Sequence, residues 1–428
     1  MKLKDILWPR LRQGEKQAET GWPVGLHHYM VANDGAYTRF HLRVEADGQG
    51  LLLANAAAAA RLAPTGTLIA KYLLEGLGEN DVLGKLQSRF QGGVAEMLGD
   101  IKRVEEIIKR LSEPGDNYPI LNLDDGALTA DASQLIAPFE ATVPLGEPAV
   151  MRPLLDRLWA VGIPHVTFLA PVEANGIHLY QAIERAEDLG MIAGVRGRAT
   201  DLWQGRLLAD LAAVGVDHVT VPYVSLVEAE HDRYLGEGDW ERATAVLRDM
   251  IRLEVCPVAE IPLLLSNEFE LEAIITGLQA EGTYNFSIYG LVTEGDSEEI
   301  LTAGGMAQAA TLLEDAAARQ EARYIWQPPV ERDERLSLEA QIGAGPRCAG
   351  DVAVRVELDG RVIPARGPAV SVGNILTDDW DKIWGAEAFK RYRERVTGPT
   401  RCGDCPGLAI CAADCPRERA GWAQGGGV

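Results

Sequence analysis

Basic residues are in short supply in this chain of 428 residues. Its 41 Lys and Arg stand against 63 Asp and Glu, which leaves a formal net charge of −22 and a pI near 4.8. Nucleic acids and anionic membrane surfaces are bound by proteins with a basic surface. We therefore expect neither nucleic acid nor a membrane among the partners, and we expect a cytoplasmic protein.

Long apolar runs are missing too. The longest, residues 51–60, is largely alanine and falls well short of the roughly 20 apolar residues that a membrane helix needs. Residues 1–13 mix Lys and Arg with scattered apolar positions, and no long apolar segment follows, so no signal peptide is predicted. The length and the 47% hydrophobic content predict several domains with sizeable cores.

Cysteine is scarce, and its six copies are unevenly placed. Cys256 stands alone and is expected to be a buried core thiol, and Cys348 also stands alone. The other four crowd near the C-terminus with the spacing C-x2-C-x5-C-x3-C: Cys402, Cys405, Cys411 and Cys415. Disulfides of secreted domains are spread along the chain, so this clustering indicates a metal or cluster site in a reducing compartment. Thiolate-only ligation suits an iron–sulfur cluster or zinc, and the spacing allows both.

The N-terminal region has the pattern of a small hairpin followed by helices. Residues 37–44 alternate between polar and apolar, and Leu51 to Leu53 form the second strand after a turn. Apolar residues then recur at helical spacing from Leu68 to Leu111. The alanine run at 56–60 is interpreted as a helix start or a packing surface. The pattern predicts a winged-helix-like domain that ends at the turn-rich segment 113–119.

From residue 139 onward, strand and helix patterns alternate at intervals of roughly 26 residues, the size of one βα unit of a parallel sheet. Glycines mark the ends of several of the helices. The strands are expected to begin near Phe139, His165, Met191, Val216, Pro257 and Tyr284. Six such units fit either a partial (β/α)6 barrel or an open doubly wound sheet, and periodicity does not distinguish the two.

A linker is predicted at residues 327–335, where two prolines precede a charge run. Beyond it, Val352 to Ile363 has the pattern of a β-hairpin that turns at Asp359-Gly360. A short helix is expected around Trp380 to Arg395, ahead of the cysteine cluster. These patterns divide the chain into three domains, at residues 1–115, 116–330 and 331–428.

The middle region resembles the radical SAM superfamily. His231-Asp232 with Gly236, a following helix and Asn267 match the order of motifs in SPASM-type members. The N-terminal region resembles the PqqD-type module that recognises precursor peptides. Together these resemblances imply an α/β protein with a partial (β/α)6 radical-SAM-type barrel and an N-terminal winged-helix-like α+β domain.

The C-terminal region resembles the SPASM domain more closely. Its landmarks, in order, are Cys348, Leu358-Asp359-Gly360, Gly373-Asn374-Ile375, Ile383-Trp384 and the C-terminal cysteine spacing. The resemblance implies a small C-terminal SPASM-like domain that binds iron–sulfur clusters.

The chain departs from this family at the residues that bind SAM. Radical SAM enzymes carry C-x3-C-x2-C after the first barrel strand, and the matching loop here, residues 142–149, has no cysteine. Of the family's Gly-Gly-Glu-Pro, only Glu173 remains, and Ala365 stands where a SPASM cysteine is usual. The resemblance then implies no SAM cleavage and one [4Fe–4S] cluster, with zinc as the alternative. The implied ligands are Cys402, Cys405, Cys411 and either Cys348 or Cys415.

Ligands of parallel βα folds bind at the C-terminal ends of the strands, and four polar residues there are candidate cofactor-binding residues. Arg196 and Arg198, two positions apart, could face one pocket and hold an anion. The alternative is that both are solvated arginines paired with local acids. Glu147 and Glu173 could serve as acid and base. His231 and Asp232 are interpreted as structural.

The favoured hypothesis is a peptide-binding accessory protein or pseudoenzyme in the maturation of a ribosomally made peptide. Its partners would be a precursor or leader peptide and a catalytically complete radical SAM enzyme. The peptide is expected to add as a strand at the edge near Leu51 to Leu53, beside the helix Leu98 to Leu111. The alternatives are an enzyme with non-radical chemistry at the strand ends and an electron-transfer protein with a single cluster. A filled site at the strand ends favours the accessory protein, and a deep polar pocket favours the enzyme.

Overall fold

The computed structural model divides into two compact units, Met1–Ala137 with Trp159–Pro164, and Pro138–Leu158 with His165–Val428. The residues that it describes are 21–33, 36–54, 58–112, 135–169, 176–292, 297–301, scattered positions between 305 and 319, 322–327, 330–348, 353–365 and 369–389.

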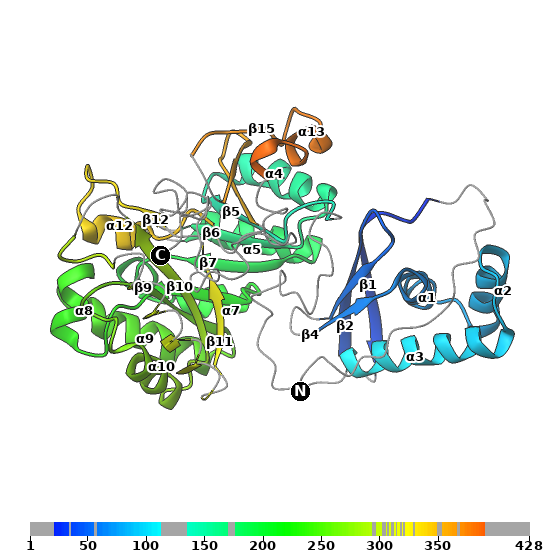
Figure 1. Ribbon diagram of the computed structural model, residues 1–428, viewed down its shortest axis with the longest axis horizontal. Helices are drawn as coiled ribbons and strands as arrows, with labels where there is room; N and C mark the ends of the chain where they lie inside the picture. Colours follow the sequence, from blue (N-terminus) through cyan, green and yellow to red (C-terminus); the bar gives the residue numbers. More distant parts are fainter. Residues whose placement is uncertain are drawn as a thin grey trace, which may run out of the picture. The chain divides into compact units, whose positions relative to one another are not determined.

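The first unit contains a four-stranded antiparallel sheet in the order β1-β2-β3-β4, followed by three helices (Figure 1). The strands are β1 (Gly25–Asn33), β2 (Ala36–Val44), β3 (Gly50–Ala54) and β4 (Ala58–Leu62). The helices are α1 (Pro64–Leu74), α2 (Glu79–Arg89) and α3 (Val94–Ser112). Phe40, Leu42 and Val44 alternate along β2 and pack in one core with Ile69 of α1 and Ile101 of α3. The helices lie where the apolar spacing predicts them.

Two strands of this sheet were not expected, and they change where its edges lie. The hairpin prediction omits β1 and β4, and it leaves Leu51 to Leu53 at an edge. The predicted hairpin is present, because β2 pairs with β3. The other side of β3 pairs with β4, so the prediction that Leu51 to Leu53 form an edge is wrong. The reading of the alanine run as a helix start is also wrong for Ala58–Leu62. Alanine has the highest helix propensity of any residue, but propensity is a small term, and pairing with β3 outweighs it here.

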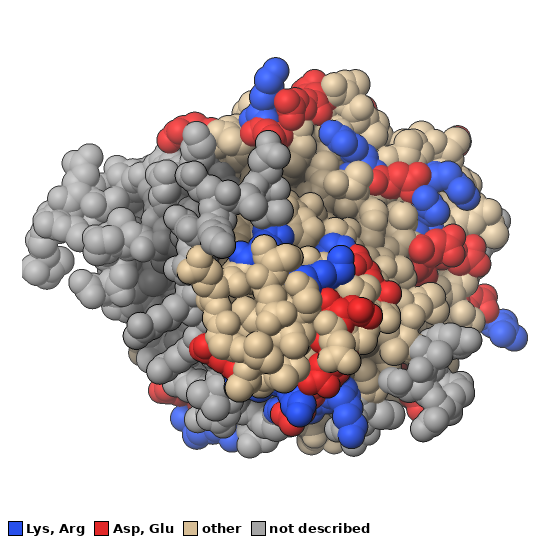
Figure 2. All heavy atoms as spheres, turned by 90° about the vertical axis from the view of Figure 1, so that its right-hand side faces the viewer, with Lys and Arg blue, Asp and Glu red and all other residues tan. Residues whose placement is uncertain are grey.

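Charges of both signs lie next to one another on the face shown in Figure 2, which looks from the right-hand side of Figure 1. On α1 of the first unit Lys71 forms an ion pair with Glu75, and on α3 Arg103 pairs with Asp100, whose side chain is buried. Pairs at this spacing contribute only a few tenths of a kcal/mol each, about 0.2–0.5. The helices of this unit are therefore held mainly by their apolar core.

The second unit is built on a sheet in the order β11-β10-β9-β8-β7-β6-β5-β13-β14-β15 (Figure 1). Its parallel strands are β5 (Glu140–Pro144), β6 (His165–Leu169), β7 (Ile192–Arg196), β8 (His218–Pro222), β9 (Cys256–Leu263), β10 (Asn285–Val292) and β11 (Arg323–Trp326), with β12 (Val330–Glu331) beside β10. Strands β5 to β10 begin within two residues of the predicted positions. Their strictly sequential order excludes the doubly wound alternative, in which the order reverses inside the sheet.

Helices connect these strands in the βα pattern. They are α4 (Pro148–Val161), α5 (Ile177–Leu189), α6 (Ala199–Leu202), α7 (Leu207–Ala213), α8 (Glu228–Leu235), α9 (Asp239–Arg252) and α10 (Leu271–Ala280). Glycine ends α5 as expected: Gly190 is its C-cap with φ 78°, a conformation that other residues rarely adopt. Among the helices that the structure describes, none combines the length and the apolar character of a membrane span.

The C-terminal region joins the same sheet. The predicted hairpin is present as β13 (Ala353–Val356) and β14 (Arg361–Pro364), followed by β15 (Gly373–Asn374) and α13 (Trp380–Trp384). Strand β13 pairs in parallel with β5, so that Ala353 lies opposite Glu140. The segment predicted as a linker contains β12 and leads into a further helix, α12 (Leu338–Ala344), which the sequence analysis did not predict.

We expect the core of the first unit to be sensitive to truncation at Ile101. This side chain is fully buried, and replacing it with alanine should lower the free energy of unfolding of the unit by about 2–5 kcal/mol through lost burial and a cavity. Hydrogen exchange of the α1 and α3 amides measures the loss locally. Val94→Ala on the same helix is the control, because Val94 is 48% exposed and its truncation should change little. Equal protection in both variants would contradict the assigned core.

Candidate functional site

The parallel sheet of the second unit has one apolar and one polar face, and both are buried. Val166 and Phe168 of β6 point to one face, whereas His165 and Thr167 alternate with them and point to the other. The same alternation repeats on the neighbouring strands. The buried polar residues are Glu140, Thr142, His165, Thr167, Arg196, His218, Thr220, Glu260, Asn285 and Ser287. Because buried polar groups are expensive unless they are paired, this face is where a site is expected.

Arg196, at the end of β7, is held by Glu260 of β9. The Arg196 Nε donates to Glu260 Oε1 at 2.9 Å, and Nη2 donates to Oε2 at 2.5 Å. The two side chains are 9% and 2% exposed, so the guanidinium and the carboxylate neutralise each other away from water. The guanidinium of Arg196 is therefore already paired inside the protein.

Helix α12 covers the same end of the sheet. Arg196 Nη1 donates to the carbonyl of Gly343 at 3.3 Å, and the hydroxyl of Tyr289 on β10 lies 3.5 Å from the carbonyl of Ile342. Leu338 and Ile342 pack in one buried cluster with side chains from the ends of β9 and β10. At the end of α12, Gly345 has φ 63°, and a side chain there would collide with the Arg196 guanidinium. The carboxyl ends of β9 and β10 are thus filled by apolar packing.

Arg198 does not join Arg196 in a common pocket. It is exposed, and its Nη2 donates to the carbonyl of Leu235 at the end of α8, 2.7 Å away. Its side chain also runs beside Gly343 of α12. Cations are favoured at helix C-termini, where carbonyl groups lack partners within the helix. The two arginines therefore bind the ends of helices.

The candidate acid–base pair is not brought together by the described residues. Glu147 is exposed in the connection between β5 and α4, where its carbonyl accepts hydrogen bonds from the Val150 and Met151 amides. Glu173 lies outside the described residues. The interpretation of His231 and Asp232 as structural is supported. Asp232 accepts from the amides of Gly238 and Trp240, at the start of α9.

His231 is fully buried and holds the turn after β8. Its Nδ1 lies 3.3 Å from the Val224 amide, and its Nε2 lies 3.1 Å from Asp239 Oδ2. One ring therefore ties the end of β8 to the first turn of α9. The resembled motif therefore fixes a loop here.

A buried cluster of ionisable residues on the polar face was missed by the sequence analysis. The Nε2 atoms of His165 and His218 lie 2.7 Å apart, and His165 Nδ1 lies 3.5 Å from Glu140 Oε2. Thr167 donates to the other Glu140 oxygen at 2.6 Å. His218 reaches His165 across Gly194, where a side chain would collide with the imidazole. The sequence does contain a signal for this cluster. Polar residues occupy alternate positions of strands that are predicted to be buried.

Burial keeps both imidazoles neutral. It lowers the pKa of His218 to about 4 and lowers that of His165 well below its usual value. His218 Nδ1 has no hydrogen-bond partner among the described residues. The cluster also does not form a metal site: within the described ranges no three His, Cys, Asp or Glu side chains converge as ligands.

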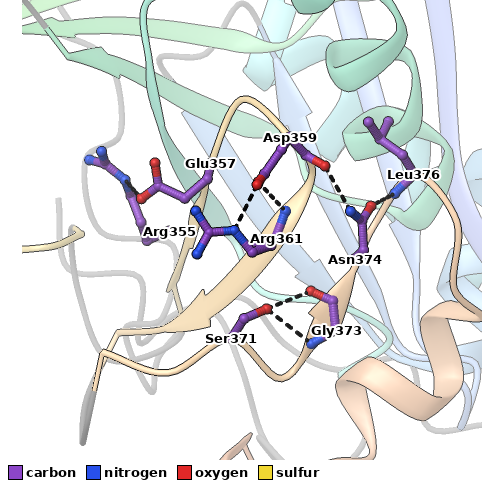
Figure 3. A network of polar contacts seen from close by, with 8 residues as sticks. All are labelled: Arg355, Glu357, Asp359, Arg361, Ser371, Gly373, Asn374 and Leu376. Carbon is purple, nitrogen blue, oxygen red and sulfur yellow. Dashed lines mark hydrogen bonds and ion pairs between the residues drawn. The ribbon is translucent and has the colours of Figure 1, made fainter.

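The C-terminal hairpin is braced by polar contacts (Figure 3). Asp359 accepts from Arg361 Nε at 2.7 Å, and its carbonyl accepts from Asn374 Nδ2 at 2.7 Å. The Asn374 side-chain oxygen in turn accepts from the Leu376 amide at 2.9 Å. The turn requires glycine at Gly360, which has φ 89° and lies against Asn374. The hairpin therefore has its own framework of hydrogen bonds.

Cys348 precedes this hairpin and is the only candidate cluster ligand in the described part of the chain. It is 2% exposed and packs with Ala353 and Ala365, the latter at the position where a SPASM cysteine is usual. Burial raises the pKa of its thiol to about 12, whereas the thiolate is the form that binds metal. In these apolar surroundings the free Cys348 side chain is a protonated thiol. Cys402, Cys405, Cys411 and Cys415 lie outside the described residues.

The His165–His218 pair should make the second unit sensitive to acid. The unfolded chain binds a proton at His218 below pH 6.5, whereas the folded chain resists it down to about pH 4. The free energy of unfolding should therefore fall as the pH drops through this window, by at most about 1.4 kcal/mol per pH unit for one proton. His218→Gln should flatten that slope in urea unfolding. Thr220→Val, which alters the next buried position without removing a titrating group, should keep it, and an unchanged slope in His218→Gln would refute the assignment.

Comparison with known proteins identifies the C-terminal region. Residues 348–406 match SPASM, an iron–sulfur cluster-binding domain, which agrees with the resemblance read from the sequence. The match contains Cys348, Cys402 and Cys405. No curated protein sequence matches the chain significantly.

The fold as a whole is similar to that of Streptococcus suis SuiB. The structure of SuiB bound to S-adenosylmethionine aligns with a TM-score of 0.53 at 12% identity, covering 90% of this chain and 95% of that one. SuiB bound to its precursor peptide SuiA aligns over the same shares with a TM-score of 0.52 at 12% identity. A structure of anSMEcpe with AdoMet and a peptide aligns with a TM-score of 0.45 at 11% identity, over 64% of this chain and 88% of that one. At such identities the likeness to SuiB is one of fold.

Proposed function

We propose that this chain is a peptide-binding accessory protein or pseudoenzyme of the radical SAM/SPASM type. It acts in the maturation of a ribosomally made peptide, either presenting the precursor to a catalytic partner or regulating that partner. The N-terminal residues 1–115 form a PqqD-like winged-helix module for the peptide. Residues 116–330 form the degenerate barrel, and residues 331–428 form the reduced SPASM region.

The observation that carries the proposal is the outer edge of β4. No described strand pairs with that side of β4, although its inner side pairs with β3 along the whole strand. Helices α1 and α3 both contact β4, so amphipathic helices pack beside this strand. An extended peptide can add to such an edge by main-chain hydrogen bonds and place alternate side chains against the helix. The proposed binding edge thus moves from Leu51–Leu53 to Ala58–Leu62.

The carboxyl ends of the strands support a role other than catalysis. Arg196 is neutralised by Glu260 and covered by α12, and Glu147 is exposed without a described acid–base partner. The loop at residues 142–149 has no cysteine to hold a cluster with an open iron. A filled site is what an accessory protein predicts and what an enzyme with chemistry at these strand ends does not. The solved complex of SuiB with its precursor peptide is consistent with a peptide partner for this fold.

One closed [4Fe–4S] cluster is proposed for the SPASM region, with zinc as the alternative. Thiolate sulfur is the donor that both prefer. Because Cys348 packs against two alanines, we propose that Cys415 completes the set with Cys402, Cys405 and Cys411. Four cysteine ligands leave no open coordination position, so the cluster would stabilise the region or relay electrons.

Peptide binding is tested with the full chain and the leader of a precursor peptide encoded beside its gene. We expect roughly micromolar affinity, about −8 kcal/mol, as for a short peptide that becomes ordered on binding. Hydrogen exchange should show new protection at Ala58–Leu62, because strand addition engages those amides. The other outer strand of the same sheet, Gly25–Asn33, serves as the internal control and should not change. Binding without protection of β4, or no binding in calorimetry, would remove the main support for the proposal.

The metal prediction is tested on protein purified without oxygen. We expect about four irons per chain, the content of one [4Fe–4S] cluster. Cys405→Ala and Cys415→Ala should lose the iron, and Cys348→Ala should retain it. With SAM and a reductant, the protein should form no 5′-deoxyadenosine above background. Two clusters per chain, stoichiometric zinc or SAM turnover would each show that the SPASM region or the barrel has been misread.

A further inference from the structure

Three apolar side chains at the carboxyl side of β8 and β9 are exposed to solvent. Phe269 is 78% exposed, Val227 is 55% exposed and Leu265 is 36% exposed. Val227 precedes α8, and the other two lie in the connection between β9 and α10. Single exposed apolar residues need no explanation, but a contiguous group often marks a binding surface.

Hydrogen bonds bring the segments that carry these side chains together. The side chain of Asn267 donates to the carbonyl of Val224 at 3.1 Å, and Ser225 donates to Glu270 at 3.1 Å. The segments around Val227 and Phe269 are therefore neighbours. The Leu265 amide donates to the carbonyl of Glu299 at 3.0 Å, and the Glu299 side chain pairs with Arg233 of α8 at 3.3 Å. The connection after β10 lies beside the same surface.

The surface around these side chains is strongly acidic. Segments 227–235, 264–272 and 297–301 contain a single Lys or Arg, which is Arg233. Their acidic residues number eight: Glu228, Glu230, Asp232, Glu268, Glu270, Glu272, Glu298 and Glu299. Arg233 is shared between Glu230 and Glu299, and Glu272 pairs with Arg319. Asp232 and Glu270 accept hydrogen bonds from within the chain. Within the described ranges Glu228, Glu268 and Glu298 form no ion pair, and these three carboxylates are the ones open to a partner. Such a concentration of one sign attracts ligands of the opposite sign.

This exposed apolar and acidic surface is separate from the buried polar face of the sheet. Helix α12 packs its apolar side against the ends of β9 and β10, whereas Phe269 is largely in water. An apolar group of three side chains is also small compared with the roughly 800 Å² that each partner buries in a stable protein–protein interface. Its size fits a short segment with one apolar anchor.

We propose that Val227, Leu265 and Phe269, with the surrounding carboxylates, form a docking site for a basic peptide segment that carries an apolar or aromatic anchor. The anchor packs on Phe269 and Leu265, and Lys or Arg side chains on either side meet the unpaired carboxylates. The site is distinct from the β4 edge and does not depend on it. It would select for the charge of a peptide, which strand addition through the main chain does not.

The experiment uses the full chain and two labelled synthetic peptides. One has lysines on both sides of a central tryptophan, and the other replaces the lysines with glutamates. Fluorescence anisotropy should show that the lysine peptide binds and that its affinity falls as salt is raised. The glutamate peptide should bind at least about tenfold more weakly. Equal binding of the two peptides would overturn the proposal.

Variants locate the site. Phe269→Ser should weaken binding of the lysine peptide about tenfold because the anchor loses its apolar contact. The double variant Glu268→Gln and Glu298→Gln should weaken binding and also reduce its salt dependence. Val370→Ser is the matched control, because Val370 is 64% exposed and lies between β14 and β15, outside these segments. All four positions are exposed or half-buried, so circular dichroism should show unchanged folding.

Unchanged affinity in Phe269→Ser, or an equal loss in Val370→Ser, would refute the assignment. A concentration-dependent dimer in gel filtration that Phe269→Ser dissociates would show that the surface binds a second copy of the chain instead. Failure of the leader peptide to protect β4 would leave these results standing, since they concern another surface.

Discussion

The ion pair between Arg196 and Glu260 governs the arrangement at the carboxyl ends of the parallel strands. Both side chains are almost fully buried, so removing either would leave a charge without a partner, which costs about 3–5 kcal/mol. The pair joins β7 to β9 across β8. It also reaches the last turn of α12 through the carbonyl of Gly343. One interaction therefore links two strands of the sheet to a helix far along the chain, and its geometry requires glycine at residue 345.

Local patterns in the sequence were enough to locate the elements whose form depends on their own residues. The strands from β5 to β10 start within two residues of their predicted positions, because glycines such as Gly190 end the helices before them. Two of the elements missed have different causes. Strand β4 directly follows β3 and pairs with it, but its alanine-rich composition favours a helix. Helix α12 follows a charged segment and is held by apolar side chains from β9 and β10, which lie far from it in the sequence.

The candidate site was predictable to the same limit. The position of Arg196 at a strand end was correct, but an anion pocket was expected because Glu260, 64 residues away, could not be seen as its partner. The two-residue spacing of Arg196 and Arg198 was taken as a shared direction. In the structure Arg198 lies beyond the strand, before α6, where the alternation of a strand no longer applies. Conversely, His165 and His218 were not predicted as site residues. Each lies in a strand where buried polar residues alternate with apolar ones, and that pattern could have indicated them.

Charge is arranged differently in the interior of the second unit and at its rim, the surface formed by segments 227–235, 264–272 and 297–301. In the interior, the guanidinium of Arg196 pairs with the carboxylate of Glu260. Neutral imidazoles lie beside Glu140. At the rim, carboxylates outnumber cations and surround apolar side chains that face water. Several buried polar groups are thus paired inside the protein, whereas His218 Nδ1 and the Asn285 side chain have no hydrogen-bond partner among the described residues. Unpaired charge at the surface, by contrast, can be neutralised by a partner with less loss of hydration than in the interior. The charged groups that a partner can neutralise therefore lie at this surface rather than in the buried pair of Arg196 and Glu260.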